Sequence, residues 1–185
     1  MTLPEKIETK RLVLRPFVFS DAEAIFAYAK NPNFSRYLDL VPQPYSLKNS
    51  EQFIAQCILQ KQEDGATRAI TMGAQNIPIG AVSIRFKNED LTLAELGWSI
   101  GETYWGNGLT TEAVAAFLHA AFTHFPKLHK IYAKSDLRNV GSWRLMEKVH
   151  MQREALMRQH AVRRGEWTDQ VWYATLRSEW ENQKH

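Results

Sequence analysis

The segment from Ala94 to Phe125 constrains the fold more than any other part of the chain. It begins with strand-forming residues, continues through a turn that holds Gly106 and Gly108, and ends in apolar residues at helical spacing. The first turn of a helix exposes unpaired N–H groups and the positive end of the helix dipole. Glycines let the backbone approach an anion without side chains in the way. The segment therefore predicts a strand–turn–helix unit that binds a phosphate group.

Two widespread phosphate motifs do not fit this turn. The chain has no Gly-x4-Gly-Lys-Ser/Thr sequence, which argues against a P-loop. A GxGxxG pattern begins at Gly106, but Thr111 stands where the third glycine belongs. The strands before the turn are patterned as antiparallel hairpins, whereas a dinucleotide site follows a parallel strand. Both common nucleotide folds are therefore disfavoured.

Length and composition indicate one globular domain over residues 1–185. Of the 185 residues 44% are hydrophobic and 23% charged, and the net charge of +3 is too small to argue for nucleic-acid binding. The single cysteine fits a reducing compartment, and no apolar run is long enough for a membrane span. We expect a soluble, cytoplasmic protein that binds neither membrane nor nucleic acid directly.

Hydrophobic periodicity predicts alternating strands and helices. We expect strands at 11–17, 67–72, 78–86, 91–100, 130–135, 154–160 and 167–176, and helices after Ser20, after Ser46, at 110–125 and at 140–149. Ser20 with Glu23 reads as a capping box, and Ser46 as an N-cap. Since helix 110–125 connects two strands, it predicts a parallel crossover within a sheet that is otherwise antiparallel. The fold class is α/β, of the α+β type.

Four parts of the chain, in the right order, resemble one enzyme family. They are Glu8–Arg15 (ETxRLxLR), the turn Trp105–Thr110, Asn139–Lys148 (NxxSxxxxEK), and Gly165–Asp169 followed by Tyr173 and Glu179-Trp180. Together they resemble the GNAT N-acetyltransferases, and within them the ribosomal-protein N-terminal acetyltransferases. The family signature at the turn is Gln/Arg-x-x-Gly-x-Gly/Ala, so Trp105 and Thr110 are departures. His150-Met151 replaces the usual Gly-Phe, which leaves a left-handed helix end without glycine.

The resemblance implies a GNAT fold and an acetyl-CoA site. The fold would have a mixed central sheet of six to seven strands, with a parallel pair splayed at the acetyl-CoA site, and about four helices. The turn would bind the pyrophosphate, and a bulged strand around Trp98–Ile100 would pair with pantetheine. The residues implied for acetyl-CoA binding are Trp98, Ser99, Ile100, Trp105, Gly106, Asn107, Gly108, Leu109, Thr110, Thr111, Asn139 and Ser142. No metal is implied, and the acetyl group would pass directly to the acceptor.

Two residues are candidates for proton transfer. Glu95 matches a strand glutamate that takes a proton from the amine, directly or through water, although it equally fits a polar strand residue paired with a cation. Ser142 is the candidate for protonating the thiolate, while His160 in the last hairpin is a lesser candidate for the base. Asn139 and Ser142 also fit as helix caps with no ligand, and capping explains Thr110 and Thr111 as well.

The remaining reactive side chains carry less information. His119 and His124 are five residues apart on a helix and so lie on different faces, which argues against a metal pair. Cys57 sits in an apolar helical stripe and fits a core residue better than a nucleophile. We expect Arg158, Arg163 and Arg164 to form a solvated face, the alternative being attraction of an acidic acceptor or of the CoA 3′-phosphate.

The predicted function is acetyl-CoA-dependent transfer to a primary amine. The resemblance favours a protein N-terminal α-amine, such as that of a ribosomal protein. Small-molecule amines (amino acids, polyamines, aminoglycosides) and a non-catalytic acetyl-CoA-binding module are the alternatives. Asp39 is the one carboxylate in the aromatic loop 31–45, which disfavours a polyamine. The sequence does not choose between a monomer and a homodimer.

Overall fold

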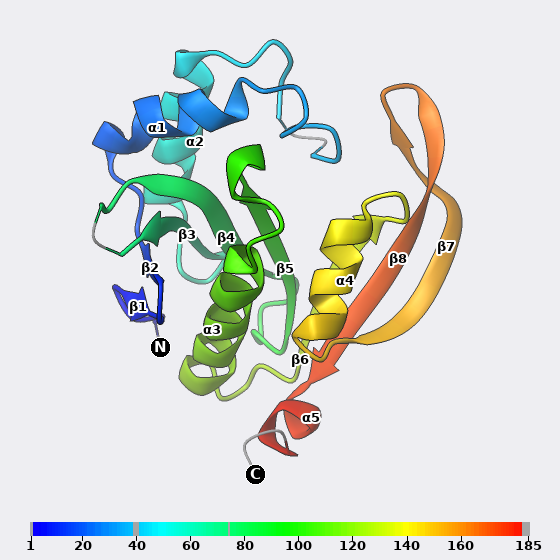
Figure 1. Cartoon of the computed structure of the whole chain (residues 1–185). Coiled ribbons are helices and arrows are strands. Elements are labelled where there is room, and N and C mark those ends of the chain that lie inside the picture. Colours follow the sequence, from blue (N-terminus) through cyan, green and yellow to red (C-terminus); the bar gives the residue numbers. More distant parts are fainter. Residues whose placement is uncertain (1, 39–40, 74, 183–185) are drawn as a thin grey trace.

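A computed structural model describes residues 2–38, 41–73 and 75–182 of the chain (Figure 1). The strands are β1 (Ile7–Glu8), β2 (Leu12–Arg15), β3 (Gly65–Met72), β4 (Pro78–Phe86), β5 (Leu93–Ile100), β6 (Lys130–Asp136), β7 (Gln152–Arg163) and β8 (Glu166–Leu176). The helices are α1 (Ala22–Ala29), α2 (Leu47–Leu59), α3 (Leu109–His124), α4 (Val140–Lys148) and α5 (Arg177–Asn182), with short 3₁₀ turns at Phe19–Asp21 and Glu102–Tyr104. Among these described helices, none has the length and apolar character that crossing a membrane requires.

All eight strands form one mixed sheet in the order β1-β2-β3-β4-β5-β6-β8-β7. The β5–β6 pair is parallel and the other neighbours are antiparallel, as the sequence predicted. The predicted count of six to seven strands is low, because the two residues of β1 are too few to show a period. The predicted count of about four helices misses α5, a six-residue helix directly after β8.

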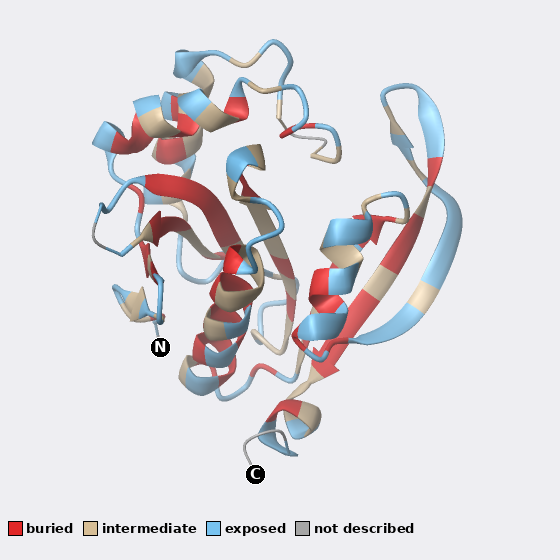
Figure 2. Ribbon diagram, viewed as in Figure 1, coloured by how far each residue is buried: buried red, intermediate tan, exposed pale blue. Residues whose placement is uncertain are grey.

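The sheet carries a separate apolar core on each face. Ala94 and Leu96 of β5 belong to the core under α3 and α4, whereas Ala81 of β4 packs with Ile25 of α1 and Ile54 of α2 on the other face. In Figure 2 the buried residues of α3 form a stripe, while much of β7 is exposed. The face opposite α3 is therefore covered by helices over β3 and β4 but more open over β5–β8.

The two serine caps have different outcomes. Ser46 caps α2 as predicted, since its hydroxyl accepts a hydrogen bond from the backbone N–H of Asn49. The capping box at Ser20 is wrong: α1 begins at Ala22, after a 3₁₀ turn. There Asp21 is buried and accepts two hydrogen bonds of 2.8 Å from the guanidinium of Arg15. This ion pair comes from a neighbouring strand, which a local capping pattern does not show.

The end of α4 takes the left-handed conformation without glycine. His150 has φ +61°, and its N–H donates to the carbonyl of Glu147, while Met151 N–H donates to the carbonyl of Met146 at 2.9 Å. These two bonds make a Schellman motif, whose left-handed position is usually glycine. The replacement of Gly-Phe by His150-Met151 therefore keeps the local geometry and carries a strain cost.

Replacing His150 with glycine should stabilise the protein. The left-handed region costs an L-residue roughly 1–2 kcal/mol, and the extra chain entropy of glycine offsets roughly 0.5–1 kcal/mol of the gain. We expect His150→Gly to raise the free energy of unfolding in urea by about 0.5–1 kcal/mol. Arg144→Gly, at an exposed position in the middle of α4, is the control and should lower it by about 1 kcal/mol. Equal losses in both variants would show that His150 is unstrained.

Candidate active site

The predicted site residues come from two loops that follow parallel strands. The glycine turn follows β5 and leads into α3, while Asn139 follows β6 and leads into α4. Because parallel strands end at the same edge of a sheet, both helices begin at that edge, and α3 and α4 lie on the same face of the sheet (Figure 1). The structure therefore places at one edge of the sheet the two helix starts in which the sequence predicted site residues.

β5 and β6 separate toward this edge. Their pairing is confined to Leu93–Glu95 with Lys130–Tyr132, after which the ends of both strands have no partner across the gap. The predicted bulge near Trp98 is wrong, since β5 stays in unbroken register with β4 up to Ile100. Beyond these pairs each strand keeps only its other neighbour, β4 for β5 up to Ile100 and β8 for β6 up to Asp136. The backbone of Trp98–Ile100 is left facing the gap on the β6 side.

The glycine turn has the backbone that an anion site requires. Gly106 and Gly108 have φ of +77° and +72°, in the left-handed region that glycine tolerates. A Cβ built on Gly106 would meet no described atom within 4 Å. Gly108 is the N-cap of α3 and offers no side-chain cap, so the first N–H groups of the helix remain available. Thr110 and Thr111 follow the N-cap and so do not cap the helix.

An arginine from the start of the chain holds the glycine turn. Arg11 donates from Nη1 to the carbonyl of Asn107 at 3.0 Å and from Nε to Glu112 Oε2 at 2.6 Å. The hydroxyl of Thr9 donates to Glu112 Oε1 at 2.7 Å. Burial raises the pKa of Glu112, but the hydrogen bonds from Thr9 and Arg11 outweigh it and hold the pKa below its ordinary value. The sequence analysis quoted Arg11 only as part of a motif, because its partner lies 101 residues away.

Trp105 anchors the other side of the turn. Its indole Nε1 donates to the carbonyl of Ile100 at 2.9 Å, which ties the turn to the last residue of β5. Nearly half of the Trp105 side chain remains exposed. The side chains of Trp98 and Ile100 pack against the core on the α3 side, as their apolar character predicts. Only their backbone faces the gap.

The start of α4 supplies unengaged polar groups. Asn139 is the N-cap of α4, yet its side chain makes no capping hydrogen bond. Ser142 is half-buried, and its N–H donates to the Asn139 carbonyl at 3.0 Å. Asn139 itself is placed by a backbone bond to the carbonyl of Asp136 at the end of β6. Helix capping by the Asn139 side chain, the alternative to ligand binding, is therefore not what the structure shows.

Glu95 lies on the opposite face of the sheet from α3. Ala94 and Leu96 point into the core under α3, so Glu95 between them points away from it. Lys87 Nζ lies 2.5 Å from one carboxylate oxygen of Glu95, and Lys134 Nζ lies 3.5 Å from the other. Burial raises the pKa of Glu95, but the hydrogen bond from Lys87 and the charges of Lys134 and Lys87 outweigh it, and the net pKa is lowered.

Tyr132 is a site residue that the sequence analysis missed. It pairs with Glu95 at the last residue pair before the strands part, and its hydroxyl lies 3.3 Å from Glu95 Oε2. Burial, and then Glu95, raise the pKa of Tyr132 to about 12, so it stays protonated at neutral pH. Its ring stacks on Trp172 at 5.3 Å, and His160 meets the edge of Trp172. His160 is thus separated from Glu95 by two aromatic rings.

Arg163 and Arg164 of the β7–β8 hairpin donate hydrogen bonds to other parts of the chain, which corrects the expectation that these two arginines are solvated. Arg163 Nη1 donates to the carbonyl of Tyr37 at 2.5 Å, and Arg164 Nη2 donates to the hydroxyl of Ser35 at 3.1 Å. These bonds join the tip of the β7–β8 hairpin to the loop between α1 and α2. Asp39 of that loop lies outside the described residues.

Comparison with known proteins identifies the family. The family model described as acetyltransferase (GNAT) domain matches residues 11–152. The chain belongs to the GNAT acetyltransferases. It is 29% identical to the uncharacterised N-acetyltransferase YnaD of Bacillus subtilis, over 94% of this chain and 98% of the relative. The GNAT domain and these relatives support acetyltransferase activity.

Solved GNAT structures share the fold. A GNAT-family acetyltransferase from Bacillus anthracis has a TM-score of 0.84 at 28% identity, covering 94% of this chain and 99% of that one. RimL, the ribosomal L7/L12 α-N-protein acetyltransferase solved in complex with coenzyme A, has a TM-score of 0.82 at 21% identity, covering 93% and 98%. At that identity RimL supports the fold alone.

Removing the Arg11 side-chain charge should loosen the glycine turn. We expect Arg11→Met to lower the ¹⁵N order parameters of residues 106–109 from about 0.85 toward about 0.6, because the carbonyl of Asn107 loses its charged donor. Lys10→Met, at the exposed neighbouring position, is the control and should leave them unchanged. Rigid amides at 106–109 in Arg11→Met would show that the turn holds its shape without this arginine.

Proposed function

We propose that this GNAT enzyme transfers the acetyl group of acetyl-CoA to the N-terminal α-amine of a protein, of the ribosomal-protein type. The observation that carries the proposal is the pairing of Glu95 with Lys87 and Lys134 on the open face of the sheet. The fold shared with RimL, an enzyme named for α-N-acetylation of a ribosomal protein, agrees with it.

The donor side of the site fits acetyl-CoA. The free N–H groups at the start of α3 and the open space above Gly106 suit the pyrophosphate. The backbone of Trp98–Ile100, which has no partner strand on the β6 side, suits the amides of pantetheine, and the side chain of Asn139, which makes no capping bond, supplies a further polar contact. The remaining proposed contacts are those that the sequence analysis named in the turn and at Ser142.

The acceptor side favours an α-amine over a lysine or a polyamine. Near pH 7.5 about a quarter of an α-amine is neutral, against roughly a thousandth of a lysine side chain, because their pKa values are near 8 and 10.4. Glu95 has a lowered pKa and is a weak base, which suffices only for an amine that arrives largely neutral. Lys87 and Lys134 also repel a polycation.

The proposed reaction is a direct displacement. The amine lone pair attacks the thioester carbonyl carbon, the C–S bond breaks, and the thiolate leaves. Once the nitrogen has formed its new bond it becomes far more acidic, so Glu95 accepts its proton, directly or through water, despite the low pKa of the carboxylate. Ser142 relays a proton from solvent to the departing sulfur, which restores its own hydroxyl, and Glu95 releases the proton from nitrogen to solvent. A backbone N–H of β5 toward the carbonyl oxygen would stabilise the charge that develops there.

A panel of amines tests the acceptor class. CoA release should be fastest with peptides that carry a free α-amine and at least about tenfold slower with N-acetylated lysine peptides, spermidine or an aminoglycoside. Lysine and spermidine amines are almost fully protonated near pH 7.5, and Lys87 and Lys134 repel the polycations spermidine and aminoglycoside. Faster release with any small-molecule amine than with every peptide would reject the protein-terminus proposal and leave the acetyltransferase intact.

A single methyl group at Gly106 should block acetyl-CoA binding. Gly106 and Gly165 both have positive φ, +77° and +84°, and a Cβ on either meets no described atom within 4 Å. Both alanine variants should therefore lose a similar stability of about 1 kcal/mol, but Gly106→Ala alone should weaken acetyl-CoA binding by at least about tenfold. Calorimetric titration measures the affinity. Equal affinities in the two variants would place the pyrophosphate elsewhere.

The dependence of kcat/KM on pH should reflect the ionisation of the acceptor amine and not that of Glu95. Since the pKa of Glu95 is lowered, it is ionised throughout pH 6–9, and its titration adds no limb to the profile there. With a peptide α-amine, kcat/KM should rise with pH and level off near pH 8. Glu95→Gln should reduce kcat by about 10²-fold or more without moving this midpoint. A midpoint that disappears in Glu95→Gln would assign the titration to Glu95.

A further inference from the structure

A second cavity lies at the end of α3 that is remote from the glycine turn. It has a volume of about 480 Å³, within the range of about 300–1,000 Å³ that small-molecule sites occupy. Phe125, directly after α3, lines it, and the 16 residues of α3 span about 24 Å. The cavity is therefore separate from the acetyl-CoA turn at the start of the same helix.

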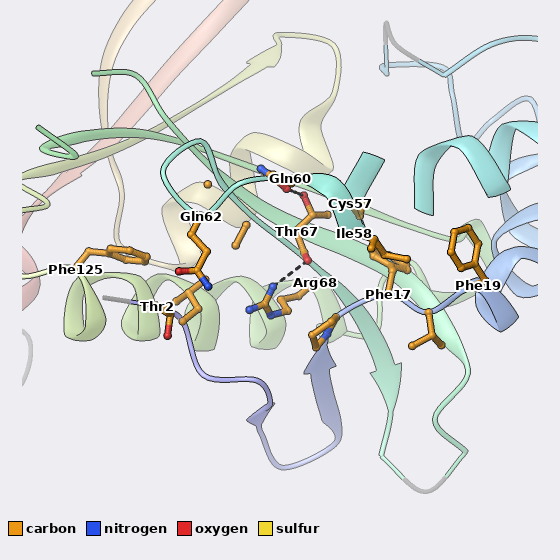
Figure 3. Close-up of a pocket in the computed structure, with 15 residues that line it drawn as sticks. Thr2, Phe17, Phe19, Cys57, Ile58, Gln60, Gln62, Thr67, Arg68 and Phe125 are labelled. Atoms are coloured by element: carbon orange, nitrogen blue, oxygen red, sulfur yellow. Dashed lines mark hydrogen bonds between the residues drawn. The ribbon is translucent and has the colours of Figure 1, made fainter. Parts of the chain in front are cut away.

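The cavity forms because one edge of β3 is left open. β2 pairs with β3 only from Ala69 to Met72, so Gly65–Arg68 have a partner strand on the β4 side alone. The chain from Pro16 to Phe19 and the end of α2 border this edge. Figure 3 shows Arg68 between Phe125 on one side and Phe17 and Ile58 on the other.

Most of the walls are apolar. Phe17 and Phe125 are buried beside the cavity, while Ile58 of α2 and Phe19 line it with 49% and 61% of their surfaces exposed. Exposed large apolar side chains that gather around a hollow mark a surface that takes an apolar group. The body of a ligand here is therefore hydrocarbon or aromatic.

Arg68 supplies a cation inside these walls, and the charge of Glu5 acts on it without a direct ion pair. Its Nε is buried without a hydrogen-bond partner, and its two Nη atoms reach only the carbonyls of Thr67 and Pro4, at 3.3 and 3.4 Å. Within residues 2–38, 41–73 and 75–182 it forms no ion pair of 4.0 Å or less. Each Nη carries two hydrogens and donates one long hydrogen bond, so the guanidinium keeps N–H groups that an anionic ligand in the cavity can engage.

We propose that this cavity binds a small organic carboxylate with an apolar body. The carboxylate accepts hydrogen bonds from the Nη atoms of Arg68, and the body packs against Phe17, Ile58 and Phe125. Guanidinium and carboxylate match in charge and in planar geometry, which selects a carboxylate over a neutral ligand of the same shape. This binding site is independent of the acetyl-transfer proposal, since it lies at the other end of α3.

The chain contains its own reporter for this site. Cys57 is the one cysteine in the sequence, and it lines the cavity. Burial raises the pKa of the Cys57 thiol to about 11, against smaller opposing effects of Thr67 and Arg85, so it reacts slowly and at a measurable rate. A bound ligand shields the thiol, so the alkylation rate of the whole protein reports occupancy without any acetyl-transfer assay.

Octanoate and octanamide test the proposal, because they differ in the charged group and share the hydrocarbon chain. Calorimetry should detect binding of octanoate, and octanoate should slow the alkylation of Cys57 by iodoacetamide. Octanamide should bind at least about tenfold more weakly. Arg68→Gln should lose the preference for octanoate. Arg153→Gln on β7, at the far edge of the sheet, is the matched control and should keep it.

A second variant covers the case in which Arg68→Gln fails to fold. Ile58→Glu changes an exposed wall residue and should abolish octanoate binding by repelling the carboxylate, while the circular dichroism spectrum stays unchanged. Equal binding of octanoate and octanamide, or no protection of Cys57 by either, would overturn the proposal. So would protection that depends on protein concentration alone, which would mean that a second copy of the chain covers the cavity.

Discussion

The site depends on the brief parallel contact between β5 and β6. Three residue pairs hold these strands together, after which β6 continues with β8 while β5 continues with β4. A sheet that parts in this way leaves backbone hydrogen-bonding groups in its middle without a strand to satisfy them. Both helices then start at the same edge, where α3 presents N–H groups without a side-chain cap and α4 presents the side chain of Asn139. The gap, the turn and the two helices are one consequence of where the strands stop pairing.

Local sequence patterns were enough to predict most of the fold and the glycine turn. The glycine turn, the strand before it and the helix after it are encoded by neighbouring residues, and all three appear within one or two residues of their predicted bounds. Ser46 as an N-cap and the left-handed end at His150 follow from the same local rules. β1 has two residues and α5 has six, and segments this short contain too few residues to show a hydrophobic period.

What the sequence did not predict depends on contacts between distant residues. Arg11 donates a hydrogen bond to Glu112, and Tyr132 donates one to Glu95 on the adjacent strand. Arg15 binds Asp21 in the turn where the sequence predicted a serine cap. Considered with its sequence neighbours alone, each of these residues fits an ordinary structural role, so no local pattern indicated the contact. The positions of Lys87 and Lys134 beside Glu95 were not predicted either. With these partners the net pKa of Glu95 is lowered, which makes it a weak base. The catalytic roles of Glu95 and Ser142 remain proposals that rest on this geometry.

The bond between Arg11 and the glycine turn also has a consequence for how the chain is made. Thr9 and Arg11 leave the ribosome about a hundred residues before Glu112, and until that residue arrives they have no partner for this network. Contacts of such long sequence separation form late in folding. The turn therefore takes its final shape only after Arg11 and the start of α3 have met, so a nascent chain that ends before α3 lacks the contacts that hold this turn.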